Sequence, residues 1–399
     1  MTENFRGYVR PLGRVGIRNH VAVLPAIQGA NELAHMMAQQ VPGVVELLHN
    51  FGSRFVGLDK IRGVKSVVGL GASPNVYAVL VVGINCESVS VEELVTMINA
   101  NGGNAYGIKI TREKTYEQVL EEGVELLKKL CAEAEVQERK LCRVSDLTVA
   151  VRCGGSGAIS AISSNGAVGA AVDMLVDRGA TVIFSETAEL IGADEKLAQR
   201  AATPEVAKQL RSCVARMQEK IRSHGVDILG SEPSQFNIDQ GLTTIEEKSM
   251  GAIIKSGSRP LVGVLEYADR PQNGPGLYFM DGSAQSPILF AGMIAAGAQL
   301  LLFSYGGGFA ARCRNLTTFP TNVKTFPAIK IMGSCDDDVA KPYFDIYAGD
   351  IIRGTESVEQ VGGRLYEKTL AIASGELTYT DKNISYNEMF QLYSDGLLM

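Results

Sequence analysis

The chain has 399 residues, of which 46% are hydrophobic and 21% are charged, and its formal net charge is −6. This composition excludes a disordered chain, because it supplies enough apolar surface to form a core, and the length predicts two or three domains. The acidic balance also argues against a nucleic-acid partner, which requires a basic surface.

The N-terminal segment MTENFRGYVRPLGRVG has neither the charged nor the apolar region of a signal peptide. No apolar run reaches the roughly 18–20 residues that a membrane span requires. We therefore expect a cytoplasmic protein without a membrane partner. The cysteines are odd in number and have no CxxC spacing, so neither a disulfide framework nor a zinc ribbon is expected.

The first part of the chain alternates short apolar runs with amphipathic segments. Residues 20–27 and 75–82 are typical of buried strands, and helical patterns follow them at 31–40 and 90–99. Strands that alternate with helices predict a parallel sheet.

A charged helix over 116–134 leads to a polar stretch, where we place the boundary between an N-terminal domain, residues 1–138, and a C-terminal domain, residues 139–399. The second domain repeats the alternation. Its expected strands are 146–151, 180–184, 260–265 and 299–303, and its expected helices are 167–178, 203–224 and 244–255, with a loop at 231–241. The fold class that we expect is α/β, with two Rossmann-like units whose sheets are rich in parallel strands.

Chemically unusual loops follow several predicted strands, and ligands of α/β proteins bind at the carboxyl ends of strands. The stretch Cys153-Gly154-Gly155-Ser156 follows one strand and precedes a helix. Its backbone N–H groups could surround an anion beside a thiol. Glycines at strand ends are also common turn formers, so the loop is equally typical of a plain turn.

Two further clusters lie in the N-terminal half. Cys86 and Glu87 place a thiol beside a carboxylate, a pair that can ligate a metal or move a proton, although cysteine is also a common core residue. His49, Ser53 and Arg54 combine an imidazole, a hydroxyl and a guanidinium, which suits a carboxylate-bearing substrate.

Two later segments have both a structural and a functional interpretation. The segment GLTTIEEKS is typical of a capped helix start, with threonine at the cap and glutamate three residues later, but it also directs N–H groups and a hydroxyl outward. The turn Gly306–Gly308 either approaches a ligand closely or simply reverses the chain. The motifs of P-loop, serine-hydrolase and zinc-protease sites are absent, as is GxGxxG after the first strand, so nucleotide chemistry is not supported.

Several colinear segments resemble blocks of the altronate/galactarate dehydratase family, and together they span essentially the whole chain. They are GYVRPLGRVGIRNHVAVLP, GASPNVYAVLVVGINCES, RCGGSGAISAISSNGAVG, FSETAELIGADEKLAQRA, GLTTIEEKSMGAIIKSG and YFDIYAGDII. The resemblance implies a lyase that eliminates water from a sugar acid, or sulfite from sulfolactate, with iron or another divalent metal. It also implies that a small domain, which precedes the first block in common family members, is supplied by a separate small subunit.

Departures from the family pattern fall where chemistry is expected. Gly29 and Ser53 stand where the family has thiols, and Arg152 and Gly157 stand where it has acids. Thiolates and carboxylates hold iron-type metals, so these replacements weaken the expected metal site.

The residues that are retained predict a site. The predicted catalytic residues are His49, Cys86, Glu87 and Cys153. The predicted substrate-binding residues are Asn31, Ser53, Arg54, Arg152, Gly154, Gly155, Ser156, Thr243, Thr244 and Lys248. The predicted metal ligands are His49, Cys86 and Cys153, with iron as the expected ion.

The predicted function is β-elimination of water or sulfite from a small anionic hydroxy acid, such as a sugar acid or sulfolactate, by a homo-oligomeric lyase. The alternative is a diverged, non-catalytic paralogue that binds an anion or regulates an active relative.

Overall fold

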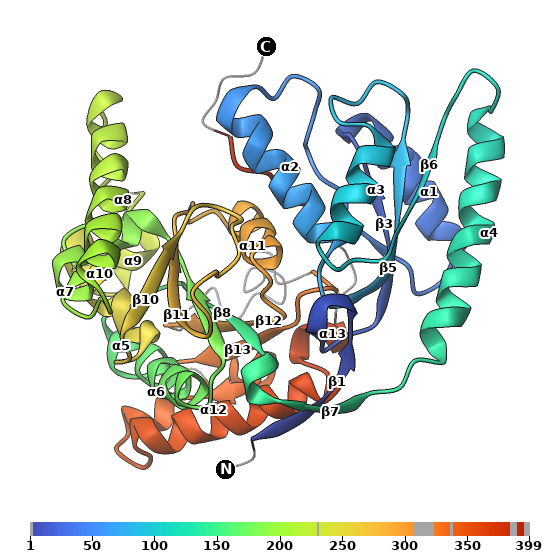
Figure 1. The fold of residues 1–399 in the computed structure, drawn as a ribbon. Helices are drawn as coiled ribbons and strands as arrows, with labels where there is room; N and C mark the ends of the chain where they lie inside the picture. Colours follow the sequence, from blue (N-terminus) through green and yellow to red (C-terminus); the bar gives the residue numbers. More distant parts are fainter. Residues whose placement is uncertain (1–2, 230, 307–322, 336–337, 384–388, 395–399) are drawn as a thin grey trace.

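The computed structural model describes residues 3–229, 231–306, 323–335, 338–383 and 389–394, which form three sheets (Figure 1). A four-stranded sheet has the order β4-β3-β5-β6, and a seven-stranded sheet has the order β10-β11-β9-β8-β12-β13-β14. Every strand pair in these two sheets is parallel. The predicted α/β class with two parallel-rich units is confirmed.

The strands have the following bounds. The small sheet consists of β3 (His20–Pro25), β4 (Val45–Glu46), β5 (Val76–Gly83) and β6 (Ala105–Lys109). The large sheet consists of β8 (Thr148–Gly154), β9 (Thr181–Phe184), β10 (Leu261–Leu265), β11 (Gly276–Met280), β12 (Leu300–Tyr305), β13 (Ala328–Met332) and β14 (Ile346–Tyr347). A third, antiparallel sheet joins β1 (Asn4–Val9), β2 (Val15–Gly16) and β7 (Lys140–Arg143).

Helices cover both parallel sheets. They are α1 (Asn31–Gln40), α2 (Gly57–Gly71), α3 (Val91–Ala100), α4 (Tyr116–Glu135), α5 (Ala158–Ile162), α6 (Ser164–Asp177), α7 (Asp194–Ala198), α8 (Pro204–Ser223), α9 (Gln235–Asp239), α10 (Ile245–Ala252), α11 (Ser286–Ala295), α12 (Val358–Ala373) and α13 (Tyr379–Asn383). Two 3-10 turns also matter for the site, namely η4 (Thr187–Leu190) and η5 (Ile253–Ser256).

Local sequence explains where several helices begin. Ser90 caps α3 in a reciprocal box with Glu93, and Thr115 caps α4 with Gln118. The predicted loop at 231–241 contains α9, so the prediction of an irregular segment there is wrong. The side chain of Ser234 accepts the backbone N–H of Asn237, whose own side chain accepts the N–H of Ser234, and this pair starts the helix.

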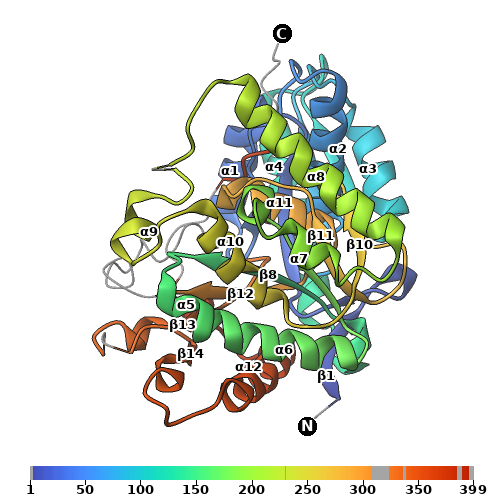
Figure 2. The same ribbon diagram turned by 90° about the vertical axis from the view of Figure 1, so that its left-hand side faces the viewer.

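One cluster of buried apolar side chains spans both units, and another lies on the opposite face of the large sheet. Along β8, Val149 and Val151 face a cluster formed with α6 and α12, whereas Ala150 faces a second cluster. That second cluster also contains Phe290 of α11 and Val67 of α2, so the far face of the large sheet packs against the first unit. Figure 2 shows α6 and α12 lying together below the large sheet.

Both ends of the described chain cross between the units. Strand β1 pairs with β7, and Phe5 is buried in the same cluster as α12. In the other direction, the backbone N–H of Phe390 donates to the carbonyl of Leu48 at 2.8 Å, and that of Leu392 donates to Asn50 Oδ1 at 2.8 Å. The expected boundary after residue 138 lies directly before β7, in this crossover region.

One buried amide ties the units together. Asn75, which directly precedes β5, donates through Nδ2 to the carbonyls of Gln299 at 2.7 Å and Thr325 at 2.9 Å. Its Oδ1 accepts the N–H of Ile17 at 2.8 Å. Because a buried amide without partners is costly, these bonds fix the start of β5 against the large sheet.

Within the described part of the chain, one helical segment is apolar and long enough to cross a membrane by length and composition alone, namely Ala158–Asp177, which contains α5 and α6. In the fold it packs between the large sheet and α12, and Val168 and Val172 are fully buried there. Its apolar character is therefore that of a core helix.

A glycine at the contact between α2 and α11 provides a test of the shared core. A Cβ added to Gly69 would overlap the Cβ and Cα of Ala295. We expect Gly69→Ala to lower the free energy of unfolding by about 1–3 kcal/mol, because the two helices would have to move apart. Gly166→Ala on α6 is the matched control, since its Cβ would meet Val358 at 3.5 Å, an ordinary contact. Urea unfolding of both variants measures the difference, and equal stabilities would contradict the close packing.

Candidate active site

A thiol and two carboxylates meet at the carboxyl edge of the large sheet. Cys153 lies near the end of β8, and Glu186 and Glu189 follow the end of β9. Cys153 Sγ is 3.2 Å from Glu189 Oε2 and 3.9 Å from Glu186 Oε2. Among the described residues, these three side chains form the only group of three His, Cys, Asp or Glu ligand atoms that lie within 4.8 Å of one another.

The ammonium of Lys255 lies among these three groups. Lys255 belongs to η5, and its Nζ is 2.9 Å from Cys153 Sγ, 3.0 Å from Glu186 Oε2 and 3.5 Å from Glu189 Oε2. The side chain is 2% exposed. A lysine removed from water to this extent needs opposite charges around it, and both glutamates supply them.

The cluster extends into a chain of alternating charges. Arg152 Nε donates to the other oxygen of Glu186, Oε1, at 2.9 Å, and Lys248 Nζ contacts the other oxygen of Glu189 at 2.9 Å. Lys248 also forms an ion pair with Glu232. The order Arg152–Glu186–Lys255–Glu189–Lys248–Glu232 thus alternates three cations with three carboxylates.

Burial and these neighbours shift the pKa values of the cluster in different directions. Burial raises the pKa of the Cys153 thiol to about 12, with a further contribution from the Glu189 carboxylate. Burial would also raise the pKa of Glu189, but the ammonium groups of Lys248 and Lys255 lower it to about 2. At Glu232, burial and the charge of Glu189 raise the pKa to about 7 despite the ion pair with Lys248.

Glu186 has an unusual backbone. Its φ is +84°, which is in the left-handed region that side chains other than glycine rarely adopt. The strain turns the chain sharply after β9 and directs the carboxylate toward both Arg152 and Lys255.

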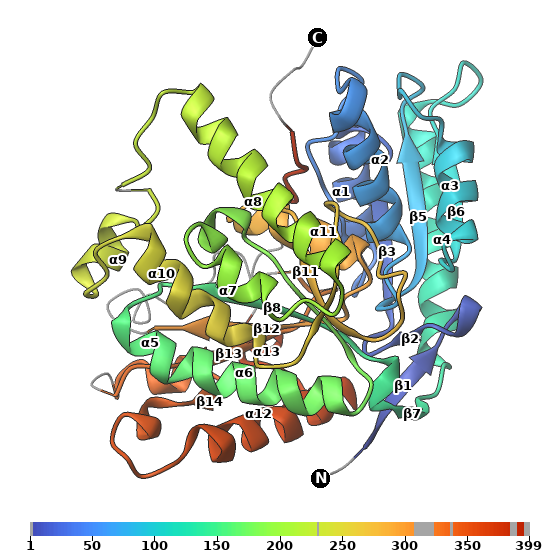
Figure 3. The same cartoon turned by 60° about the vertical axis from the view of Figure 1, so that its left-hand side comes forward.

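A cavity of about 340 Å³ lies beside the cluster. Its polar lining comes from α5, α6, α7 and α10 and from the loop after β8, and includes Ser156, Ser160, Asn165, Lys196 and Lys248. This volume suits a small molecule. Lys248 lines the cavity and also belongs to the alternating chain of charges, through its contact with Glu189. Figure 3 shows α5, α9 and α10 gathered at this end of β8.

The glycine loop after β8 is held from several sides. Gly155 has a φ of +59°, and its carbonyl accepts the N–H of Gly306 at 3.2 Å. The carbonyl of Ser156 accepts a hydrogen bond from Asn237 Nδ2 at 2.8 Å, so α9 fixes the loop. Gly307 and Gly308, the rest of the predicted glycine turn, lie outside the described residues.

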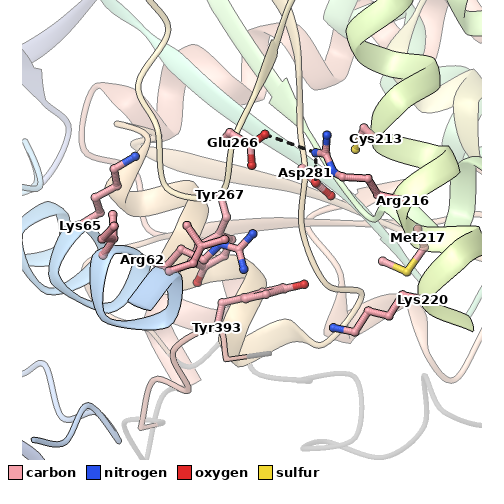
Figure 4. Close-up of a pocket in the computed structure, with 12 residues that line it drawn as sticks. Arg62, Lys65, Cys213, Arg216, Met217, Lys220, Glu266, Tyr267, Asp281 and Tyr393 are labelled. Carbon is pink, nitrogen blue, oxygen red and sulfur yellow. Dashed lines mark hydrogen bonds and ion pairs between the residues drawn. The ribbon is translucent and has the colours of Figure 1, made fainter. Parts of the chain in front are cut away.

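A larger cavity of about 520 Å³ lies between α2 and α8 (Figure 4). Its charged lining includes Arg62, Arg216 and Asp281, and Arg216 is paired with Asp281 at 2.8 Å. Asp281 accepts a hydrogen bond from the Thr187 hydroxyl at 2.6 Å, and Thr187 begins the same turn that carries Glu189. Neither the buried cluster nor any residue predicted for the site lines this cavity.

Several predicted site residues of the large sheet have structural partners. All three nitrogens of the Arg152 guanidinium are engaged, by Glu186, by the Ser286 hydroxyl and by the Ala284 carbonyl. Thr244 caps α10 by accepting the N–H of Glu247 at 3.2 Å, and Thr243 donates to the Glu247 carboxylate. Both threonines are exposed, and neither lines the cavity beside Lys248.

The predicted residues of the first unit lie around the carboxyl edge of the small sheet. His49 is fully buried, with Nε2 donating to the Pro25 carbonyl at 2.7 Å and Nδ1 accepting the N–H of Phe51 at 3.1 Å. Both ring nitrogens are therefore occupied. Asn31 Nδ2 donates to the His49 carbonyl, and the Glu87 carboxylate accepts the N–H of Asn85. Ser53, Arg54 and Cys86 are exposed.

The structure does not bring His49, Cys86 and Cys153 together. The ligand atoms of these three residues do not all lie within 4.8 Å of one another. Of the three, only Cys153 belongs to the group found among the described residues, which it forms with Glu186 and Glu189. The sequence did not predict Glu186, Glu189, Glu232 or Lys255 as site residues. A signal for the first two was present, because Glu186 and Glu189 lie within five residues of the end of a predicted strand, and carboxyl ends of strands carry ligand-binding groups.

A divalent metal fits the donor types but not the arrangement. A thiolate and two carboxylates are suitable ligands for iron or zinc at about 2.0–2.3 Å. Here the Lys255 ammonium is within hydrogen-bonding distance of Cys153 and Glu186 and 3.5 Å from Glu189, so a cation already stands at the position that these donors share. The residues as arranged therefore do not hold a metal ion together with Lys255.

The hydrogen bonds of His49 predict a pH-dependent stability. Burial lowers its pKa to about 4, below the value of about 6.5 in an unfolded chain, so the fold favours the neutral ring. This contribution is present above pH 6.5 and is lost as the pH falls toward 4. We expect the free energy of unfolding of the wild type, relative to that of His49→Gln, to decrease by about 2 kcal/mol between about pH 7 and about pH 5. Urea unfolding of both proteins at each pH measures this difference.

His35→Gln is the control for replacing a histidine as such, because His35 is exposed and lacks the buried hydrogen bonds of His49. If His49→Gln shows the same decrease in stability as the wild type over this pH range, His49 is not held as a buried neutral ring.

Comparison with known proteins gives the family. Residues 144–396 match the family model "D-galactarate/Altronate dehydratase, C-terminal", and residues 7–135 match "D-galactarate dehydratase/Altronate hydrolase, second domain". The chain is 33% identical to (2R)-sulfolactate sulfo-lyase subunit beta of Chromohalobacter salexigens over 385 residues, which cover 94% of each chain.

Two further relatives are named as dehydratases. Altronate dehydratase of Bacillus subtilis is 28% identical over 96% of this chain and 76% of its own length. Galactarate dehydratase (L-threo-forming) of Escherichia coli is 29% identical over 82% of this chain and 62% of its own length. Together with the family models, which cover most of both units, these matches confirm the resemblance noted in the sequence. The chain belongs to the D-galactarate/altronate dehydratase family.

Proposed function

We propose that this chain is a lyase that catalyses β-elimination of water or sulfite from a small anionic hydroxy acid. The names of three relatives, one sulfo-lyase and two dehydratases, support this reaction class. The observation that carries the proposal is Lys248, a buried cation that lines a cavity of suitable size and contacts two carboxylates of the charged chain.

In the proposed reaction, Lys248 binds the carboxylate of the substrate. β-Elimination removes the proton next to that carboxylate, and the negative charge then spreads onto the carboxylate oxygens as an enediolate. The enediolate forms the carbon–carbon double bond as the bond to the neighbouring substituent breaks, and the substituent leaves as sulfite or, after it takes up a proton, as water. A fixed ammonium stabilises this charge more than it stabilises the substrate, because the charge on these oxygens increases in the transition state. Ser156 and Gly157 of the loop after β8 line the cavity beside Lys248, and the same loop, with Gly154 and Gly155, is proposed to orient the substrate.

Glu232 is the proposed base. It contacts the ammonium of Lys248, so a substrate held by Lys248 has its reacting carbon near this carboxylate. The charged groups around Glu232 are Lys248, Glu189 and Glu186. Its raised pKa, about 7, suits a group that takes up a proton near neutral pH. Cys153, a predicted catalytic residue, is proposed to position Lys255 and Glu189 within the buried cluster.

The predicted residues at the small sheet are proposed to serve a partner. Ser53, Arg54 and Cys86 are exposed around one edge, together with the partly exposed Asn31 and Glu87. The relative from Chromohalobacter is named as a subunit beta, which supports a second, small subunit for this chain. Binding of that subunit at this edge, homo-oligomerisation and a cytoplasmic location remain predictions.

The test of the function is a substrate screen over sugar acids and sulfolactate, with and without a co-expressed small subunit. Elimination leaves an enol that tautomerises to a 2-oxo acid, so product is detected as that acid and, for sulfolactate, as released sulfite as well. Turnover of at least one substrate is expected. Absence of turnover in both preparations would instead support the non-catalytic paralogue.

The role of Glu232 gives a pH prediction. The base must be unprotonated, so kcat/KM should rise as the pH increases through about 7, the raised pKa of this carboxyl group. We expect Glu232→Gln to lower kcat by about 100-fold or more and to remove this rise. Glu246→Gln, an exposed carboxylate on the first turn of α10, is the matched control and should leave the profile unchanged. A wild-type pH profile in Glu232→Gln would exclude this base.

A further inference from the structure

We propose that the ammonium of Lys255 takes the place of a divalent metal ion among Cys153, Glu186 and Glu189, so that this centre is built without a metal. The proposal goes beyond the proposed reaction and does not depend on it, because it concerns which cation the folded chain holds. It rests on the geometry of the donors, on their remaining bonds and on the charge balance.

The geometry matches an ammonium. A lysine has three N–H donors, and Nζ of Lys255 faces three acceptor atoms, Cys153 Sγ at 2.9 Å, Glu186 Oε2 at 3.0 Å and Glu189 Oε2 at 3.5 Å. The two shorter distances are those of hydrogen bonds, whereas a metal would need its ligands at about 2.0–2.3 Å.

The other carboxylate oxygens are also occupied. Arg152 Nε donates to Glu186 Oε1, and Lys248 contacts Glu189 Oε1, each at 2.9 Å. Each glutamate therefore has one oxygen on Lys255 and the other on a second cation. Neither can bind a metal through both oxygens unless one of these ion pairs breaks.

The charge balance also opposes a metal. Three cations, Arg152, Lys255 and Lys248, are matched by three carboxylates, Glu186, Glu189 and Glu232. An added divalent ion would leave the buried cluster with one uncompensated positive charge even after Cys153 loses its proton to become a ligand, and the ion would lie next to the Lys255 ammonium, where like charges repel strongly out of water. Lys255 is 2% exposed, so it has no direct route to solvent when displaced.

The first test compares metal content with binding. Wild-type protein, purified anaerobically, is dialysed and examined by elemental analysis, and then titrated with Fe²⁺, Zn²⁺ and Co²⁺. We expect metal well below one equivalent and no rise in Tm, because a ligand that binds only the folded state would raise it. One tightly held equivalent in the wild type that is lost in Cys153→Ser would overturn the proposal.

The second test removes the ammonium. Lys255→Ala leaves the thiol and both carboxylates around an emptied volume, so this variant should bind one equivalent of Co²⁺ and show a thiolate-to-cobalt charge-transfer band. Lys255→Ala/Cys153→Ser should lose that band. A folded Lys255→Ala variant that binds no Co²⁺ would also overturn the proposal.

A buried lysine elsewhere serves as the control for lost packing. Lys330 is fully buried on β13 near the rings of Phe344 and Tyr379. Lys330→Ala should therefore gain no cobalt band. If Lys255→Ala does not fold in the absence of metal, refolding it with and without Co²⁺ decides the question, since rescue by the ion supports the proposal and absence of rescue contradicts it.

Discussion

The alternating chain of charges from Arg152 to Glu232 is the constraint on which the arrangement of the site depends. Charged groups that are taken out of water are tolerated only when each has partners in good geometry. The partners here come from β8, from the strained turn after β9, from η5 and α10, and from the loop before α9. These segments must therefore keep fixed positions at the end of the large sheet, and the shared apolar core of the two units holds that sheet in place.

The same chain of charges divides the site into two parts. Lys255, Glu186 and Cys153 form a closed interior in which every charge is paired. Lys248 lines the cavity and pairs with Glu232 at the other end of the chain of charges, and this pairing can change when a substrate carboxylate arrives. We infer that the interior is a rigid support that orients Lys248 through Glu189, and that the reaction takes place at Lys248 and Glu232. The larger cavity between α2 and α8 contacts the turn that carries Glu189 through Asp281 and Cys213, which both bind Thr187, and none of the charged chain lines it.

The sequence predicted the fold better than the site. Apolar runs and capping residues located β3, α1, α3 and α4 closely. The glycine-rich α2 was missed because glycine is a poor helix former, and α11 was missed because it is uniformly apolar and has no amphipathic pattern. At the site, Cys153 and Lys248 were predicted, but Lys255 was not, since a lysine near a helix end is usually solvated and its partner Cys153 is 102 residues away in sequence. The cluster around His49 contains residue types suited to catalysis, but the ring is used for local hydrogen bonds. Such pairings depend on tertiary contacts that local pattern does not encode.

The most direct measurement is the crystal structure of the protein with an unreactive analogue of a small hydroxy acid. We expect the carboxylate of the analogue to lie beside Lys248 and Ser156, with Lys255 still bound to Cys153 and Glu186. An analogue bound instead between Arg62 and Arg216, in the cavity between the two units, would contradict the central claim that the charged chain at the end of β8 is the reaction site.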